Sequence, residues 1–139
     1  MNVTLLRTSF EALKPQAPRL VDRFYAILFE KFPRVKPMFA HVDMASQKNH
    51  LIQALALLVA NLERADILKT YLTGLGAKHV RYGVRDEHYD AVGQSLLSAM
   101  GEVAGPLWTD ELRNEWAATY GVVASLMKQG ASAPAGVGV

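Results

Sequence analysis

The chain has 139 residues, half of them hydrophobic and a fifth charged, with a formal net charge of +2. This length and balance predict one globular domain that buries roughly 65–70% of its unfolded surface. The absence of cysteine excludes disulfides, thiolate metal sites and cysteine nucleophiles.

The charge pattern and the apolar runs point away from nucleic-acid and membrane partners. Lys and Arg residues are scattered along the chain, so no basic face is predicted. The longest apolar run, Ala54–Ala60, is far too short to span a bilayer. The first residues, MNVTLLRTSFEALK, lack the apolar core of a signal peptide, and we therefore expect a cytoplasmic protein.

Apolar residues recur every three or four positions, and the alternation typical of strands is nearly absent. This spacing predicts a first helix over about 3–13 and a second over about 20–32, both near prolines. The segment FPRVKPMF holds two prolines and predicts a corner with short helical turns at most. Ser46 is expected to cap a third helix, whose apolar positions are Leu51, Leu55, Leu58 and Leu62.

The helical pattern continues through the second half of the chain. Asp66 is expected to open a fourth helix that ends near Gly83, with an apolar face made by Leu68, Leu72 and Leu75. A long helix follows from Asp86 or His88, and Thr109 is expected to cap the last helix.

The C-terminal segment differs in composition from the rest. Residues 130–139 read GASAPAGVGV, and such small residues are expected to form a disordered tail. The sequence therefore predicts an all-α domain over residues 1–129, with six or seven helices joined by short corners.

His79 is the first candidate for a functional residue. It extends the apolar face of the fourth helix, so its imidazole is expected to point inward. A buried histidine bonded to a backbone carbonyl is the commoner role, and this helix alone favours it. The alternative is an axial ligand of haem iron, which needs an unprotonated ring nitrogen facing a flat apolar cavity.

Two polar residues on earlier helices raise the same question. Tyr25 lies among apolar neighbours, so its hydroxyl is expected to point inward and to need a partner. Gln47 falls about 50° from the centre of the apolar face of its helix, at the edge of the buried stripe. Each residue could be structural, or could be a hydrogen-bond donor placed over a ligand.

Taken together, the motifs of the chain resemble those of a known family. They are, in order, RFYAILFEKFP, VKPMF, SQKNHLIQAL, AKHVRYGV, HYDAVGQSLL and WAATYGV. Over roughly residues 3–129 they are similar to the bacterial single-domain globins, the group related to the globin domain of flavohaemoglobins. The resemblance implies a globin fold of six to eight helices around a haem b pocket.

The resemblance also implies roles for individual residues. His79 would be the proximal iron ligand, and Tyr25 and Gln47 the distal polar pair. Leu51 would lie over the iron and Lys78 would reach a haem propionate. Further pocket residues would be Phe39, stacked on the haem edge, and Tyr89, Val92 and Tyr120.

His50 is an alternative distal residue, because some globins place a histidine at this spacing before the proximal ligand. By the same angular estimate His50 lies about 110° from the apolar centre, about twice as far as Gln47. Choosing Gln47 also leaves Leu51, rather than Ala54, over the iron. We therefore favour Gln47 and expect His50 at the surface or at a propionate edge.

The proximal side departs from the flavohaemoglobin pattern. In that group a histidine, a tyrosine and a glutamate form a hydrogen-bonded set that favours oxygen activation. Tyr89 fills the tyrosine position, but the glutamate position falls near Ala131, and no acidic residue follows Glu115. No Gly-rich nucleotide loop or flavin site is evident either.

Buried donors stabilise bound O₂, which carries partial negative charge, more than CO. The leading functional hypothesis is therefore a haem b globin that binds O₂ tightly through Tyr25 and Gln47. Its ligands could also include NO, CO or sulfide. The alternative is a nitric oxide dioxygenase that converts NO to nitrate with electrons from an external reductase. A gas sensor is less favoured, and the sequence leaves the oligomeric state open.

Overall fold

The computed structural model describes residues 1–132, which form α-helices and short 3₁₀ helices and contain no strand. The six α-helices are α1 (Val3–Leu13), α2 (Ala17–Lys31), α3 (Met44–Ala60), α4 (Ala65–Arg81), α5 (Asp86–Ala104) and α6 (Asp110–Ser132). The 3₁₀ helices are η1 (Lys14–Gln16), η2 (Pro33–Phe39) and η3 (Gly105–Leu107). The predicted all-α fold is confirmed, and the proline-rich corner is η2.

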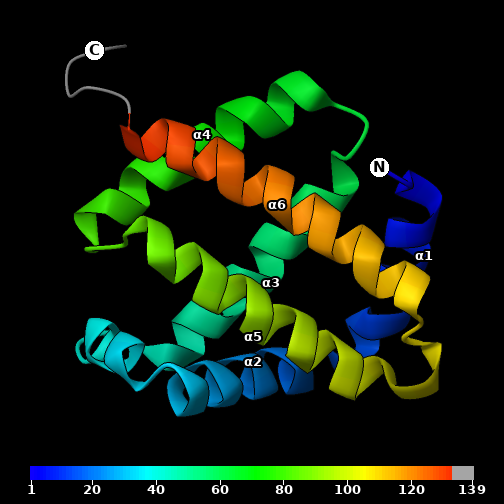
Figure 1. Ribbon diagram of the computed structural model, residues 1–139, viewed down its shortest axis with the longest axis horizontal. Coiled ribbons are helices and arrows are strands. Elements are labelled where there is room, and N and C mark those ends of the chain that lie inside the picture. The colour runs from blue at the N-terminus through cyan, green and yellow to red at the C-terminus, as the bar shows by residue number, and fades with distance from the viewer. Residues whose placement is uncertain (133–139) are drawn as a thin grey trace.

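The helices pack in two crossing pairs (Figure 1). The most extensive contact is between α4 and α6, and the next is between α2 and α5. In Figure 1, α3 lies between these pairs, while η2 and the C-terminal end of α4 lie at the same end of the molecule. The core is made by apolar side chains of all six helices, among them Leu6, Leu28, Leu72, Met100 and Trp116.

Helix starts follow local capping chemistry. Thr109 caps α6 as predicted, because its hydroxyl accepts a hydrogen bond from the Leu112 amide at 3.1 Å. The prediction for α3 was wrong. The cap is Asp43, whose carboxylate accepts from the Ala45 amide at 3.1 Å and from the Ser46 hydroxyl at 3.0 Å.

The boundary expected after Gln129 was also wrong, because α6 continues to Ser132. Gly130 is buried, and a Cβ atom added to it would come within 1.9 Å of the Thr73 carbonyl oxygen. The missing side chain is therefore what lets α6 approach α4 there. The rest of the tail, 133–139, lies outside the described residues.

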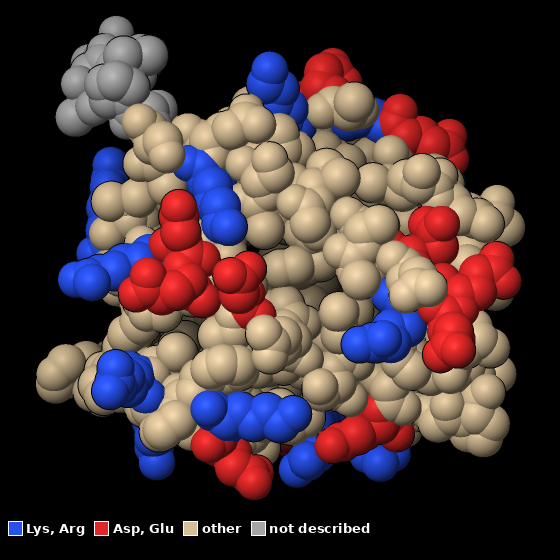
Figure 2. Space-filling view, in the orientation of Figure 1, with Lys and Arg blue, Asp and Glu red and all other residues tan. Residues whose placement is uncertain are grey.

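The charged side chains on the face seen in Figure 2 are of both signs and interleaved. This distribution matches the scattered Lys and Arg residues of the sequence. Within residues 1–132, no helix combines the length and apolar character needed to cross a bilayer.

Candidate functional site

The first group of candidate residues lies between α2, η2 and α3. Gln47 Nε2 donates a hydrogen bond to Tyr25 Oη at 3.1 Å. The Tyr25 and Phe39 rings make an edge-on contact, with centroids 5.6 Å apart. Tyr25 is buried and Gln47 half-buried. The structure therefore brings three residues singled out from the sequence into one cluster.

The hydrogen bond in this cluster has a defined direction. A carboxamide NH₂ group only donates, so the tyrosine oxygen is the acceptor. The proton of the Tyr25 hydroxyl is not used in this bond. Burial raises the pKa of Tyr25, although the Gln47 bond opposes the shift, so the hydroxyl stays protonated near neutral pH. It can therefore donate to a third atom.

Phe29 completes the cluster and was not selected from the sequence. Its ring lies 5.8 Å from that of Tyr25 and 5.4 Å from that of Phe39, measured between centroids. Phe29 follows Tyr25 by four positions on α2, so both project from one helix face. That spacing was the signal in the sequence.

The second group lies on α4. His79 is half-buried, and its Nδ1 atom lies 2.7 Å from the Leu75 carbonyl oxygen. Because a carbonyl only accepts, this bond places the ring proton on Nδ1 and leaves Nε2 with a lone pair. Burial lowers the pKa of His79, despite the opposing effect of the carbonyl, and keeps the imidazole neutral. A neutral imidazole oriented in this way can coordinate a metal.

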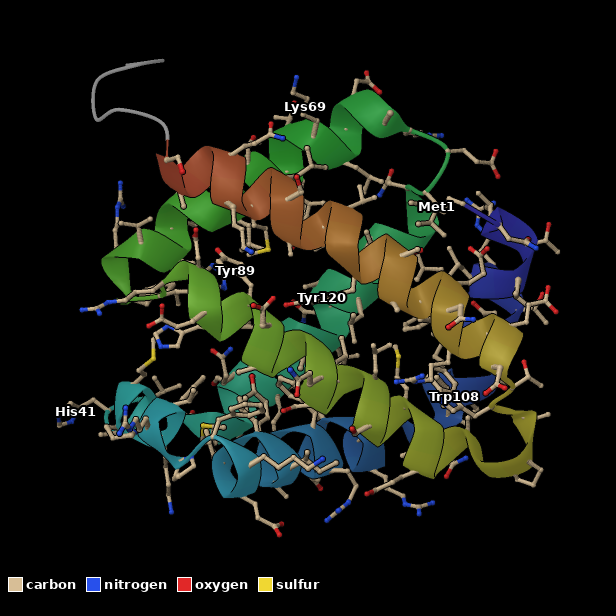
Figure 3. All side chains as sticks on the ribbon, viewed as in Figure 1. Met1, His41, Lys69, Tyr89, Trp108 and Tyr120 are labelled. Atoms are coloured by element: carbon tan, nitrogen blue, oxygen red, sulfur yellow. The ribbon has the colours of Figure 1, made fainter. Side chains whose placement is uncertain are left out.

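The third group lies where α5 meets α6, and Tyr89 and Tyr120 lie between these helices in Figure 3. Tyr120 Oη donates to the Tyr89 backbone oxygen at 2.6 Å. The Tyr120 ring crosses α5 at Gly93, where an added Cβ atom would come within 2.6 Å of the ring. The ring position therefore depends on that glycine.

The Tyr89 side chain is buried, yet its hydroxyl has no hydrogen-bond partner within residues 1–132. Lys128 lies beside it, with Nζ 5.7 Å from the centre of the Tyr89 ring. Ala131, where the glutamate of the flavohaemoglobin pattern would fall, is half-buried on α6. The structure thus contains a buried hydroxyl without a partner in the described residues, and the expected glutamate position carries an alanine.

The remaining candidates differ in exposure. Leu51 and Val92 are half-buried and pack against the core, whereas Lys78 is exposed. His50 is exposed, while Gln47 on the same helix contacts Tyr25. In Figure 3, His41 lies at the outer edge of the molecule. Within residues 1–132, no three His, Cys, Asp or Glu side chains are grouped to hold a bare metal ion.

The residues present fit a haem group. His79 offers a single neutral nitrogen, and several apolar side chains are only half-buried, although each packs against the core. These are Phe39, Leu51, Leu75, Val84 and Val92. A flat apolar cofactor could bury side chains of this kind. This combination in an all-helical domain is the one expected of a helical haem protein.

Comparisons with known proteins identify the family. The family model named Globin matches residues 22–127. Leghemoglobin 2 of Sesbania rostrata is 34% identical, with 92% of this chain and 94% of that protein covered. A flavohemoprotein of Rhizobium meliloti is 31% identical over 88% of this chain, which spans only 31% of that longer relative. The chain belongs to the globin family.

Solved structures agree with this assignment. A bacterial globin from Campylobacter jejuni superimposes with a TM-score of 0.81 and 27% identity, over 93% of both chains. An engineered carbene transferase from Rhodothermus marinus gives a TM-score of 0.82 and 26% identity, over 94% of this chain and 90% of that one. The name of the latter also carries nitric oxide dioxygenase as a suggested activity. The family supports haem-based gas binding for this chain.

Proposed function

We propose that this globin binds O₂ tightly at haem b, with His79 as the proximal ligand and Tyr25 and Gln47 as the distal pair. Haem b would supply the ferrous iron at which the gas binds. The observation that carries the proposal is the direction of the Gln47–Tyr25 bond, which leaves the Tyr25 proton free to be donated. Gln47 holds the tyrosine oxygen in place and can donate its second amide proton.

The donors act by favouring a ligand that gains negative charge. A hydrogen bond to such a group contributes about 1.5–3 kcal/mol, which corresponds to roughly tenfold to a hundredfold in affinity. CO gains much less charge than O₂, so the same donors favour O₂. We therefore expect O₂ to be released slowly.

On the other side, His79 would bind iron through Nε2, since Nδ1 is held by the Leu75 carbonyl. Leu51 and Val92 would cover the two faces of the haem, and Phe39, Tyr89 and Tyr120 would complete the pocket wall. Lys78 precedes the ligand on α4 and is exposed, as a partner for a propionate must be. His50, also exposed, is left without a distal role.

The direct test is the O₂ dissociation rate of Tyr25→Phe. We expect release to be about tenfold to a hundredfold faster, with CO dissociation changed less than about threefold. Tyr82→Phe is the matched control, because Tyr82 is 66% exposed and the substitution keeps the ring whose centroid lies 5.8 Å from that of His79. An O₂ rate equal to that of the unchanged protein would remove the proposed role of Tyr25.

A second candidate function is nitric oxide dioxygenase, favoured by the suggested activity of the Rhodothermus marinus structure. The conversion of NO and O₂ to nitrate takes up one electron, which an external reductase would have to supply. Rapid mixing of the O₂-loaded protein with NO would test it, with and without a flavin reductase. Nitrate formed over many cycles would support this function, and a single turnover in both cases would leave only gas binding.

A further inference from the structure

We propose that the ion pair between Asp22 and Lys48 is a clamp that positions Gln47 on Tyr25. Lys48 Nζ lies 2.9 Å from Asp22 Oδ1, and joins α3 to α2. The inference rests on the proposed function, because its effect on gas release acts through the distal pair. Asp22 and Lys48 are positioning residues, since neither takes part in the hydrogen bond that it would hold.

The clamp and the hydrogen bond lie side by side across one helix interface. Asp22 and Tyr25 are three positions apart on α2, so they project from the same helix face. Gln47 and Lys48 are consecutive on α3, and both reach α2. Two neighbouring residues of one helix are thus tied to two residues of another, which restricts rotation of α3 about its axis.

Apolar packing holds this part of α3 only partly, because Met44 and Leu51 contact the core but are only half-buried. The buried side chains of the helix, Leu55, Leu58 and Val59, are all in its second half. Residues 44–54 are only half-buried or exposed. Within residues 1–132, the side-chain bonds that tie 44–54 to another helix are those of Gln47 and Lys48. The cap at Asp43 bonds only within the same turn.

The solvent exposure of the Asp22–Lys48 ion pair indicates how much it can contribute to stability. The side chain of Lys48 is 32% exposed and that of Asp22 is 62% exposed. Exposed ion pairs contribute little to global stability and are weakened by salt. Loss of the clamp is therefore expected to change how often Gln47 occupies its position on Tyr25, with little effect on folding.

The experiment compares Lys48→Met with two restoring variants, Lys48→Arg and the charge reversal Asp22→Lys with Lys48→Asp. Two quantities are measured on the haem-loaded protein: the O₂ dissociation rate and the NMR signals of the Gln47 side-chain amide. We expect Lys48→Met to speed O₂ release by about two- to fivefold and to shift or broaden the amide signals. Both restoring variants should return these quantities toward their original values, and high salt should imitate Lys48→Met.

Arg23→Met is the matched control. Arg23 follows Asp22 on α2 and forms an ion pair with Glu102 on α5, at 2.7 Å and with similar exposure of 43% and 46%. This variant should leave both the amide signals and O₂ release unchanged. An equal effect of Arg23→Met, or normal amide signals in Lys48→Met, would overturn the clamp.

Failure of the clamp can be told apart from failure of the proposed function. The amide signals of Gln47 report its position whether or not Tyr25 acts on O₂. If Tyr25→Phe leaves O₂ release unchanged while Lys48→Met disturbs the amide, the clamp holds and the distal role is wrong. If Tyr25→Phe speeds release while Lys48→Met changes neither quantity, the distal role holds and the clamp is wrong.

Discussion

The two sides of the proposed haem site are built by different means. Between α2 and α3, polar groups are paired: Tyr25 with Gln47 and Asp22 with Lys48. Where α4, α5 and α6 meet, the Tyr89 hydroxyl is buried without a partner within residues 1–132. His79 and Tyr120 bond there to backbone carbonyls, those of Leu75 and Tyr89, and α4 and α6 are in close contact. One side pairs polar side chains with each other, and the other combines close helix packing with side-chain bonds to backbone carbonyls.

On the side formed by α4 and α6, the two helices approach each other closely. A Cβ atom added to Gly76 would come within 1.9 Å of the Met127 carbonyl oxygen. Gly130 meets the Thr73 carbonyl at the same distance, from the opposite helix. These two glycines set the distance between α6 and the helix that carries His79, which lies three residues after Gly76.

The largest expected effect is on His79. His79→Gly should lower haem occupancy at least about tenfold, since the single oriented imidazole is removed. The Soret absorbance per protein measures this, and added imidazole should partly restore it. His50→Gly is the control and should keep its haem, because His50 is exposed. Haem loss in His50→Gly with retention in His79→Gly would reverse the assignment.

The second prediction tests the side formed by α4 and α6 alone. Gly76→Ala should destabilise the protein by about 2–3 kcal/mol, because the Met127 backbone cannot move as a side chain could. Gly74→Ala, two residues earlier on α4, has nothing within 4 Å of the added Cβ atom. It should be neutral or stabilise by up to about 1 kcal/mol. Urea denaturation of both variants measures the difference, and equal stabilities would contradict a tight crossing at Gly76.

This difference between the two sides also explains what could be predicted from the sequence. Helical spacing predicted the helices, and inward-facing polar residues pointed to Tyr25, Gln47 and His79. The helix faces placed Tyr25 inward and Gln47 at the edge of an apolar stripe, and the family resemblance implied that the two form a pair. Polar chemistry can be recognised from residue types in this way.

Close helix packing that depends on a missing side chain could not be predicted from residue types in the same way. Gly130 was assigned to a tail because small residues carry no apolar area to bury. In the structure this glycine is instead buried against the Thr73 backbone. Its lack of a side chain leaves room for the two helices to come together. The partner of such a residue is far away in sequence and leaves no periodic signal. Asp43 was missed for a simpler reason, since Ser46 is an equally good cap by residue type.

The third prediction concerns pH. Burial is the main cause of the raised pKa of Tyr120. Above pH 10, the ordinary value, the unfolded chain releases this proton while the folded protein keeps it. Stability therefore falls as pH rises, by up to about 1.4 kcal/mol per pH unit. In Tyr120→Phe the fall above pH 10 should be shallower, although loss of the bond to Tyr89 costs about 1 kcal/mol at pH 7.

Urea denaturation at pH 7, 10 and 11 would measure this effect, with Tyr82→Phe as the control. Tyr82 is exposed, so this variant makes the same substitution at the surface. A slope as steep in Tyr120→Phe as in the unchanged protein would mean that other groups govern the alkaline loss. Tyr25 and Tyr89 also have raised pKa values and would then be the next residues to replace.

The smallest expected effect comes from comparing the two sides of the site by the same change, tyrosine to phenylalanine, at one position on each side. Tyr89→Phe removes a buried hydroxyl that has no partner within residues 1–132, so stability should be unchanged or rise by up to about 1 kcal/mol. Tyr25→Phe takes the acceptor away from Gln47 and should cost about 1 kcal/mol in the same haem-loaded state. If both variants lose the same stability, the Tyr89 hydroxyl is paired in solution. The proximal side would then also depend on pairing between polar side chains, in addition to helix packing and the bond of His79 to the Leu75 carbonyl.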